Sequence, residues 1–437
     1  MKKIGLIVFA CCFAASEAAA QSGASYYVSP SGNDNIACTD AQNIETPMQT
    51  INMAISCLNA GDTLYVRGGT YAESLSDPGV ASGTSWDNPV TIAAYPGNCS
   101  AGCETVWMQP PNGPGNSYVI YFSQTEQYII FDGINIDYSN GDATNYMSGI
   151  NITSGTYMGT SFNAHHIRFQ NAEFLGNRAI GDLSQSAIAI SFEALNTDAV
   201  GFNEVINCKI HGSGGSNASY GFYIQSGSNL VELSEFYDLG FQAGQFYDGW
   251  MGTATNNIFY GNSVHDIVTG LDDRRNGVLM AGNGNLAYDN LFWNINAGGI
   301  FDGNQTVIAV YGGFDANLVF NNTIINSVAD AIGVAAGQTN TLIANNISYG
   351  MMGGAVNGVY DEGTGTIDMT NSWDVAPGAD PLFVNPSGTP PDLRLQAGSP
   401  AIQGGTVLGA PYNIDILGNP RPMDSVETNY DIGAYQQ

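Results

Sequence analysis

Asp238 and Asp266 lie one repeat apart in this chain, each four residues beyond the same position of a recurring asparagine pattern. If successive repeats stack as strands about 4.8 Å apart, the two carboxylates become neighbours on one face. Such a pair suits calcium binding or the two acids of a retaining glycosidase. The sequence thus predicts Asp238 and Asp266 as catalytic or calcium-binding residues. The alternative is that both are exposed turn residues, because short polar residues commonly follow strands.

The segment TGLDDRRNG is the densest charge cluster, with two acids and two bases in four residues: Asp272, Asp273, Arg274 and Arg275. A lyase needs a base beside a uronate carboxylate and a cation to neutralise that carboxylate. The two arginines suit the lyase reaction, and the two aspartates could supply an acid for hydrolysis. His265, directly before one of the paired aspartates, is a candidate general base. The alternative is a turn whose charges pair with each other.

Aromatic residues gather in the same region, and four of them are candidate substrate-binding residues: Tyr237, Tyr247, Trp250 and Trp293. Aromatic rings can cover the apolar faces of sugars, so these residues predict a stacking platform. The alternative is core filling, which is the commonest role of large aromatic side chains. His165 and His166, in FNAHHIRF, are expected in a loop.

The element that must position these side chains is a repeat. Aligning similar segments superposes Asn171, Asn207, Ser234, Asn262, Asn290, Asn322, Asn346 and Asn371, at intervals of 36, 27, 28, 28, 32, 24 and 25. Each unit holds short apolar runs separated by Gly, Asn and Ser, with no amphipathic helical stretch. This pattern predicts an all-β fold, a parallel β-helix with one coil per unit.

The repeated asparagine has a structural role in such a fold. A sharp turn between two strands requires one left-handed residue, which costs most residues about 1 to 2 kcal/mol and which Asn tolerates best after Gly. Gly133, in FDGINI, is expected to fill the same position in an earlier coil. Stacked amides can also hydrogen-bond along the coils. We therefore assign the asparagines no catalytic role.

The two ends of the repeat need covers, because a solenoid exposes its terminal coils. Residues 46–61, TPMQTINMAISCLNAG, predict a capping helix with Thr46 and Gln49 as a capping box and Gly61 as its stop. The predicted organisation is a signal peptide (1–20), an N-terminal strand and capping helix (21–75), the coils (76–375) and an irregular C-terminal cap (376–437).

The N-terminus predicts export. Lys2 and Lys3 precede an apolar run, and an A-x-A site stands before Gln21, which is typical of a secretory signal peptide. Removing this leader leaves 8 of the 10 basic and 38 of the 39 acidic residues, a net charge of about −30. Such a chain repels nucleic acid, whose binding depends on Lys and Arg. No later stretch is long and apolar enough to span a bilayer.

The five cysteines of the mature chain fit an oxidising compartment. We expect Cys38 to pair with Cys57 and Cys99 with Cys103, leaving Cys208 as a buried thiol. Their spacing does not suggest a zinc site. The single mature lysine, Lys209, is expected to be solvated on a coil.

Several segments of the chain resemble a known family. The opening YYVSPSGNDN, then TPMQTINMAI and GDTLYVRGGTY, and the ending SPAIQGG, DILGNPRP and YDIGAY are similar to secreted right-handed parallel β-helix proteins of the pectin-lyase-like superfamily. The resemblance covers nearly all of the mature chain and implies a carbohydrate laid along a groove on one face. That superfamily holds polysaccharide lyases, glycoside hydrolases, uronate epimerases and adhesins, so the resemblance implies a ligand class rather than one reaction.

Two functions from different classes fit these observations. The first is a secreted enzyme that degrades or modifies a polysaccharide, as a lyase, epimerase or glycoside hydrolase, with its site between about residues 205 and 300. The second is a non-catalytic β-helix that binds glycans or serves as an adhesive or structural surface protein. The gathering of candidate acids, bases and aromatics favours the enzyme. The scarcity of lysine and the lack of a complete family motif favour the binding protein.

Overall fold

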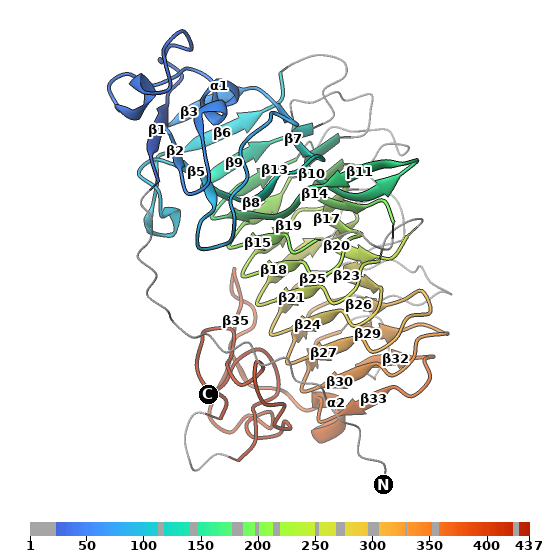
Figure 1. Ribbon diagram of the computed structural model, residues 1–437. Coiled ribbons are helices and arrows are strands. Elements are labelled where there is room, and N and C mark those ends of the chain that lie inside the picture. The colour runs from blue at the N-terminus through green and yellow to red at the C-terminus, as the bar shows by residue number, and fades with distance from the viewer. Residues whose placement is uncertain are drawn as a thin grey trace.

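The computed structural model describes residues 23–111, 118–139, 147–176, 187–196, 201–212, 219–249, 253–267, 276–295, 306–327, 330–351, 358–422 and 428–437. These residues wind into stacked coils in which three parallel sheets run along one axis (Figure 1). Between the two ends, each coil adds one strand to each sheet, so neighbouring strands in a sheet come from successive coils. The predicted all-β parallel β-helix is confirmed.

The three sheets are named A, B and C in the order in which a coil visits them. Sheet A contains β1 (Ser25–Val28), β2 (Thr63–Val66), β5 (Val90–Ala94), β8 (Gln127–Asp132), β12 (His165–Gln170), β15 (Glu204–Ile206), β18 (Leu230–Glu232), β21 (Ile258–Tyr260), β24 (Leu286–Tyr288), β27 (Leu318–Phe320), β30 (Leu342–Ala344) and β33 (Ile367–Met369). Sheet B contains β3 (Gly69–Ala72), β6 (Val106–Gln109), β9 (Ile134–Asp137), β13 (Glu173–Leu175), β16 (Lys209–His211), β19 (Glu235–Tyr237), β22 (Ser263–Ile267), β25 (Leu291–Ile295), β28 (Thr323–Ile325) and β31 (Ile347–Tyr349).

Sheet C contains β4 (Leu75–Ser76), β7 (Tyr118–Phe122), β10 (Met147–Tyr157), β14 (Ala187–Ala194), β17 (Ser219–Ile224), β20 (Gln242–Tyr247), β23 (Asn276–Ala281), β26 (Thr306–Val310), β29 (Asp330–Val334) and β32 (Val359–Asp361). A further strand, β11 (Thr160–Asn163), folds back antiparallel on β10. A separate antiparallel pair near the C-terminus consists of β34 (Phe383–Asn385) and β35 (Asp392–Leu395).

The turn from sheet A to sheet B, which we call corner AB, holds the repeated asparagines. Each coil places one left-handed residue there, with φ between 51° and 71°: Gly133, Asn171, Asn207, Leu233, Gly261, Asp289, Asn321, Asn345 and Thr370. The residue after it points inward and forms the ladder. Asn171 and Asn207 are therefore left-handed residues, one position before the ladder. Their predicted alignment with Asn262 was wrong by one residue. The left-handed position favours asparagine for its backbone conformation, and the ladder position favours it for its hydrogen bonds.

The ladder itself runs through Asn262, Asn290, Asn322, Asn346 and Asn371, all of which are fully buried. The backbone N–H of Asn262 donates to Asn290 Oδ1 at 2.8 Å, and that of Asn290 donates to Asn322 Oδ1 at 3.0 Å. Each side chain thus accepts a backbone N–H that the sharp turn has removed from the sheet. The predicted hydrogen bonding along the coils is confirmed, and left-handed geometry is supplied by the preceding residue.

A second asparagine ladder, which the sequence alignment missed, lies where each coil enters sheet A, at corner CA. It runs through Asn203, Asn229, Asn257, Asn285 and Asn317, each accepting a backbone N–H from the coil before it at 2.8–3.0 Å. Here too a left-handed residue comes directly before the ladder position. The two ladders hold two of the three corners by the same hydrogen-bonding device.

Three neighbouring coils place aromatic residues at the left-handed position of corner CA: Tyr128, His166 and Phe202. Their rings stack along the axis, with centroids 4.5 Å and 4.9 Å apart. His165 and His166 open strand β12, so their predicted loop placement was wrong. Burial and then the neighbouring His165 lower the pKa of His166 to about 4. The stack is therefore uncharged at neutral pH.

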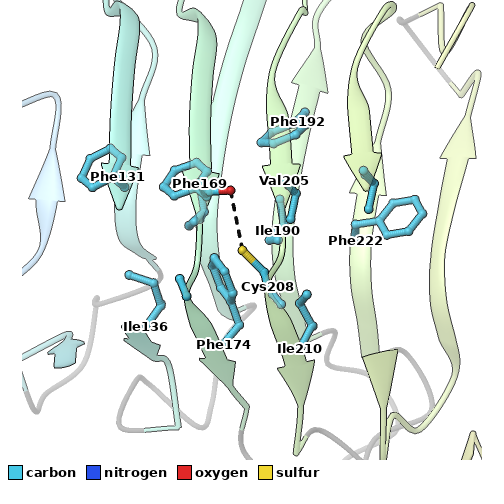
Figure 2. Packing of buried hydrophobic residues seen from close by; sticks show 14 of the residues in the cluster. Phe131, Ile136, Phe169, Phe174, Ile190, Phe192, Val205, Cys208, Ile210 and Phe222 are labelled. Carbon is cyan, nitrogen blue, oxygen red and sulfur yellow. Dashed lines mark hydrogen bonds between the residues drawn. The ribbon is translucent and has the colours of Figure 1, made fainter. Parts of the chain in front are cut away.

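The interior of the coils is filled by inward-pointing aliphatic and aromatic side chains. Phe169 and Phe174 meet edge to face with centroids 6.3 Å apart, and Cys208 lies beside them (Figure 2). The Cys208 thiol contacts the Phe169 carbonyl at 3.6 Å, and burial raises the pKa of the thiol to about 12. The predicted buried thiol is thus confirmed as a core residue.

The N-terminal cover is shorter than the predicted helix. The helix α1 spans Ile51–Ala54 and continues as a 3-10 turn, η2 (Ile55–Cys57). Thr50 caps it, while Thr46 donates to Asp40 O instead. The chain just before α1 pairs with the edge of the first coil, where Met48 and Val28 form a parallel bridge. Two further 3-10 turns are η1 (Asp40–Gln42) and η3 (Cys99–Ala101). The predicted disulfides Cys38–Cys57 and Cys99–Cys103 are both present.

At the other end, a short helix, α2 (Ser372–Val375), follows the last coil. The C-terminal segment, described over residues 379–422 and 428–437, then turns back and lies beside the later coils (Figure 1, red). Phe383, Leu393 and Ile432 pack there against outward residues of sheet B. Arg421 Nη2 donates to Asp289 Oδ1 at 2.9 Å, and both side chains are 0% exposed. In the described part of the chain, no helix has the length and apolarity to cross a membrane.

Candidate functional site

The predicted site residues that the structure describes fall on two different faces. Tyr237, His265 and Trp293 point outward from sheet B, while Tyr247 ends strand β20 in sheet C. The predicted platform therefore does not form one surface. Trp250, Asp272, Asp273, Arg274 and Arg275 lie outside the described residues. In the sequence, Trp250 follows β20 and the other four directly precede β23, so both segments adjoin strands of sheet C.

On sheet B, four rings from successive coils form a continuous stack: His211, Tyr237, His265 and Trp293. The centroids are 4.5, 5.2 and 4.3 Å apart, and neighbouring planes lie within 8° of parallel. The strands are in register here, so the stack follows from coil geometry. Trp293 is only 8% exposed because the C-terminal segment packs against it. The stacked rings therefore present their edges, and not their open faces, to a ligand.

The histidines of this stack hold carboxylates in place. His211 Nε2 lies 2.8 Å from Glu173 Oε1, and His265 Nε2 lies 3.3 Å from Glu235 Oε1. The other nitrogen of His265, Nδ1, lies 2.9 Å from Asp266 Oδ2. With both ring nitrogens engaged by carboxylates, His265 is fixed in position between two rings. Its geometry fits a positioning role.

Asp238 and Asp266 do lie on successive coils, but a backbone requirement accounts for their spacing. Both have left-handed φ, 52° and 53°, and the same place is taken by Gly212, Asn294 and Asn326 in other coils. This turn from sheet B toward sheet C needs residues that tolerate that conformation. Asn294 Nδ2 also donates to Asp266 Oδ1 at 3.0 Å. Across the described ranges, no three His, Cys, Asp or Glu side chains group as metal ligands, so calcium stays a prediction.

The outward side of sheet C is a buried polar layer. Its side chains include Asn151, Thr153, Ser191, Gln242, Gln245 and Asn276, each at most 5% exposed. Ser191 Oγ and Gln242 Oε1 have no hydrogen-bond partner within the described residues. Buried polar atoms without a protein partner are rare and mark places where water or a polar ligand binds. This layer changes to an apolar cluster of Leu279, Ala281 and Ala309 on the later coils.

Glu193 lies in this layer, on strand β14. Its Oε1 accepts a hydrogen bond from Asn151 Nδ2 at 2.9 Å, and the Thr153 hydroxyl donates to Asn151 Oδ1 at 2.8 Å, which fixes that amide. Burial raises the pKa of Glu193 above that of an ordinary glutamate. As a whole, residue 193 is partly exposed, unlike its neighbours Phe192 and Ala194. A raised pKa at a partly open position is the usual state of a general acid.

Two tyrosines lie close enough to this carboxyl group for its charge to act on them. Burial and then the charge of Glu193 raise the pKa of Tyr118 to about 12, and the pKa of Tyr223 is raised to about 12 by burial, Tyr247 and Glu193. Tyr118 stacks on Tyr121 with centroids 5.1 Å apart, and Tyr223 lies 6.0 Å from Tyr247. These phenols stay protonated at neutral pH, so they can donate hydrogen bonds and offer ring faces to a sugar.

Two more carboxyl groups belong to the same sheet. Asp248 directly follows β20 and Asp330 begins β29, and burial raises the pKa of each. Asp330 Oδ1 is buried and has no partner among the described residues. Glu193 in β14, Asp248 after β20 and Asp330 at the start of β29 are thus three acids whose pKa values burial raises.

Sequence reasoning missed Glu193. The available signal was a single glutamate in the apolar run AIAISFEA, residues 187–194. A buried strand tolerates a carboxyl group only where it has partners, so a lone glutamate there indicates a built polar site. The run was too short to show which side the glutamate faces.

Known proteins resemble this chain at three levels. The family described as a right-handed β-helix region matches residues 193–373. A pectate lyase, PEL9, of Emericella nidulans is 40% identical over 74 residues, a segment that spans 17% of this chain and 17% of that relative.

Solved structures extend the likeness over the whole fold. The pectate lyase Pel9A has a TM-score of 0.61 at 18% identity and covers 94% of this chain and 96% of its own. A rhamnogalacturonan lyase has a TM-score of 0.59 at 14% identity and covers 83% of this chain and 91% of its own. At these identities the structures bear on the fold alone. With the three-sheet coils and the matched β-helix region, they show that the chain folds as a parallel β-helix.

Proposed function

We propose that this protein is a secreted polysaccharide-degrading enzyme whose substrate lies along the outward side of sheet C, with Glu193 as the proton donor. One observation carries the proposal: Glu193 is a partly exposed residue in a buried polar layer near tyrosines, and burial raises the pKa of its carboxyl group. The leader sequence and the two disulfides support export.

The proposed chemistry is protonation of the glycosidic oxygen. Both hydrolysis and β-elimination break the bond to that oxygen, and both proceed faster when an acid donates a proton as it leaves. Glu193 keeps its proton to a higher pH than a solvated glutamate, and Asn151 fixes the carboxyl group through Oε1. A positioned general acid contributes about 10² to 10⁴ in rate.

The remaining roles follow from the adjoining segments and from the names of the similar proteins. Pectate lyase and rhamnogalacturonan lyase are named for acidic polysaccharides, so we propose a uronate-containing chain as substrate and elimination as the reaction. Arg274 and Arg275 directly precede β23 in the sequence. We propose that they neutralise the uronate carboxylate and take the proton from the carbon beside it. Asp272 and Asp273 are proposed as ligands for a bridging calcium ion. Tyr223 and Tyr247 are proposed as the sugar platform.

The test is product release from polygalacturonate, rhamnogalacturonan and neutral polysaccharides, with calcium and with a chelator. Wild type is expected to release unsaturated ends, and Glu193→Gln is expected to lower kcat/KM by about 100-fold or more while leaving the unfolding temperature nearly unchanged. Because the proton must be present on Glu193, wild-type activity should fall as the pH rises through its raised pKa. That descending limb should be absent from any residual activity of Glu193→Gln.

Glu232→Gln is the matched control. Burial raises the pKa of Glu232 too, but this residue lies on sheet A. Glu232→Gln is therefore expected to keep wild-type activity. Full activity in Glu193→Gln would refute the assignment of the proton donor. Release of saturated reducing ends would show that the reaction is hydrolysis and not the proposed elimination. Binding without any product would favour the non-catalytic glycan-binding protein.

A further inference from the structure

A groove lies at corner AB, on a different face of the molecule from sheet C. It has a volume of about 430 Å³ and is lined by Asn135, Glu173, Asn207, Lys209, Leu233 and Glu235, among others. Asn135, Glu173, Lys209 and Glu235 come from four successive strands of sheet B. Three coil steps of about 4.8 Å make the groove about 14 Å long, which suits a short linear oligomer.

The groove has fixed walls. At one end Cys99 and Ser100 line it, and they belong to a tight loop closed by the Cys99–Cys103 disulfide. At the other end lies Leu233, whose side chain is 45% exposed. Leu233 and Ile416, from the C-terminal segment, both lie within 4 Å of the position that a Cβ on Gly261 would take. The groove is therefore bounded by the disulfide loop at one end and by Leu233, close to the C-terminal segment, at the other.

Hydrogen-bonding groups in the groove alternate along its length. Glu173, Lys209 and Glu235 follow one another in register, giving acceptor, donor and acceptor at the coil spacing. The Lys209 side chain is 62% exposed, and the ion pair of its Nζ with Glu235 Oε2 is long, 3.8 Å. A long, exposed pair of this kind contributes little to stability, so the ammonium group has donors to offer a ligand.

A second layer holds the two carboxylates in place. His211 contacts Glu173 and His265 contacts Glu235, at 2.8 and 3.3 Å. Both rings are only 13% exposed because they are stacked against Tyr237. Groups that line a binding site are commonly fixed in this way by a supporting shell. The histidines and the tyrosine of the stack thus act as positioning residues for the groove.

The charges of the groove select its ligand. Two carboxylates and one ammonium group disfavour an anionic ligand, particularly on a chain with a net charge of −29. The described residues around the groove do not form a group of metal ligands. Alternating donors and acceptors match the hydroxyls of a neutral sugar, and Leu233 offers an apolar surface for the C–H side of its ring. We propose that this groove binds a neutral oligosaccharide through Glu173, Lys209 and Glu235, separately from the chemistry proposed for sheet C.

Calorimetric titration tests this proposal with linear gluco-, manno-, galacto-, xylo- and arabino-oligosaccharides, alongside oligogalacturonate. At least one neutral series is expected to bind, and Lys209→Met and Glu235→Gln are each expected to weaken its binding about tenfold or more. Lys209→Arg, which keeps donors at this place, should retain most of the affinity. Glu193→Gln should bind as wild type does, so the result does not depend on the function proposed for sheet C.

Glu45→Gln, a change at an exposed glutamate outside the groove, serves as the matched control and should leave binding unchanged. Circular dichroism of each variant checks that the coils are intact. Failure of every neutral series to bind the wild type would overturn the proposal. So would equal affinity in Lys209→Met and Glu235→Gln, or tighter binding of oligogalacturonate than of any neutral series.

Discussion

Replacing Asn290 by alanine removes one rung of the buried ladder at corner AB. The Asn290 side chain is 0% exposed, and its Oδ1 accepts from the backbone N–H and from Nδ2 of Asn262, at 2.8 and 3.1 Å. Its Nδ2 donates to Phe259 O and to Asn322 Oδ1, both at 2.9 Å. After the substitution, the Asn262 N–H and the Phe259 carbonyl lose these partners in a place that water does not reach.

The magnitude follows from those two orphaned groups. A buried polar group left without its partner costs about 1 to 3 kcal/mol, so Asn290→Ala should lower the free energy of unfolding by about 2 to 6 kcal/mol. The Asn262 Nδ2 group keeps its bond to Val231 O at 2.9 Å and adds little. Urea unfolding followed by circular dichroism measures the change.

Asn207→Ala is the comparison that separates the structure from the sequence alignment. The alignment makes the two asparagines equivalent, whereas the structure places Asn207 one position earlier, exposed and left-handed with φ 51°. Its Nδ2 bond to Asn171 is exposed, so the loss is chiefly the left-handed preference, about 1 kcal/mol. Equal losses in the two variants, or a loss below about 1 kcal/mol for Asn290→Ala, would refute this account of the ladder.

Two further predictions concern other buried or stacked groups. Arg421→Met leaves the carboxylate of Asp289 buried without its cation, so it should cost about 3 to 5 kcal/mol and make the C-terminal segment sensitive to limited proteolysis. A protease-resistant Arg421→Met protein of wild-type stability would contradict this. The lowered pKa of His166 means that its contribution to stability is present above the unfolded pKa of about 6.5 and is lost as the pH falls toward about 4. His166→Phe, which keeps an aromatic ring between Tyr128 and Phe202, should therefore flatten the loss of stability over that range in acid unfolding curves. An unchanged pH dependence would assign the effect to other groups.

The candidate site shows where sequence reasoning stopped. Asp238 and Asp266 were recognised because they recur at the coil period, yet recurrence reflects a backbone conformation that many coils share. Glu193 and Lys209 have no periodic counterpart of the same type, so the alignment gave them no weight. Their environment comes from neighbours 36 to 42 residues away in the sequence, such as Asn151 for Glu193 and Glu173 for Lys209. The pattern of residues within one repeat does not show which side chains from neighbouring coils will surround a given residue.

By itself, the sequence determined the coils, because strand runs, turn residues and inward asparagines recur within each unit and need only the next copy to stack. It also determined the disulfides, since both pairs close short loops. Tertiary structure decided which side chains share a face. The aromatic candidates separated onto sheets B and C because each coil turns through three corners. The C-terminal segment packs over Trp293 with residues that lie 90 or more positions further along the printed sequence. Burial, and with it the pKa of Glu193, exists only once those coils have stacked.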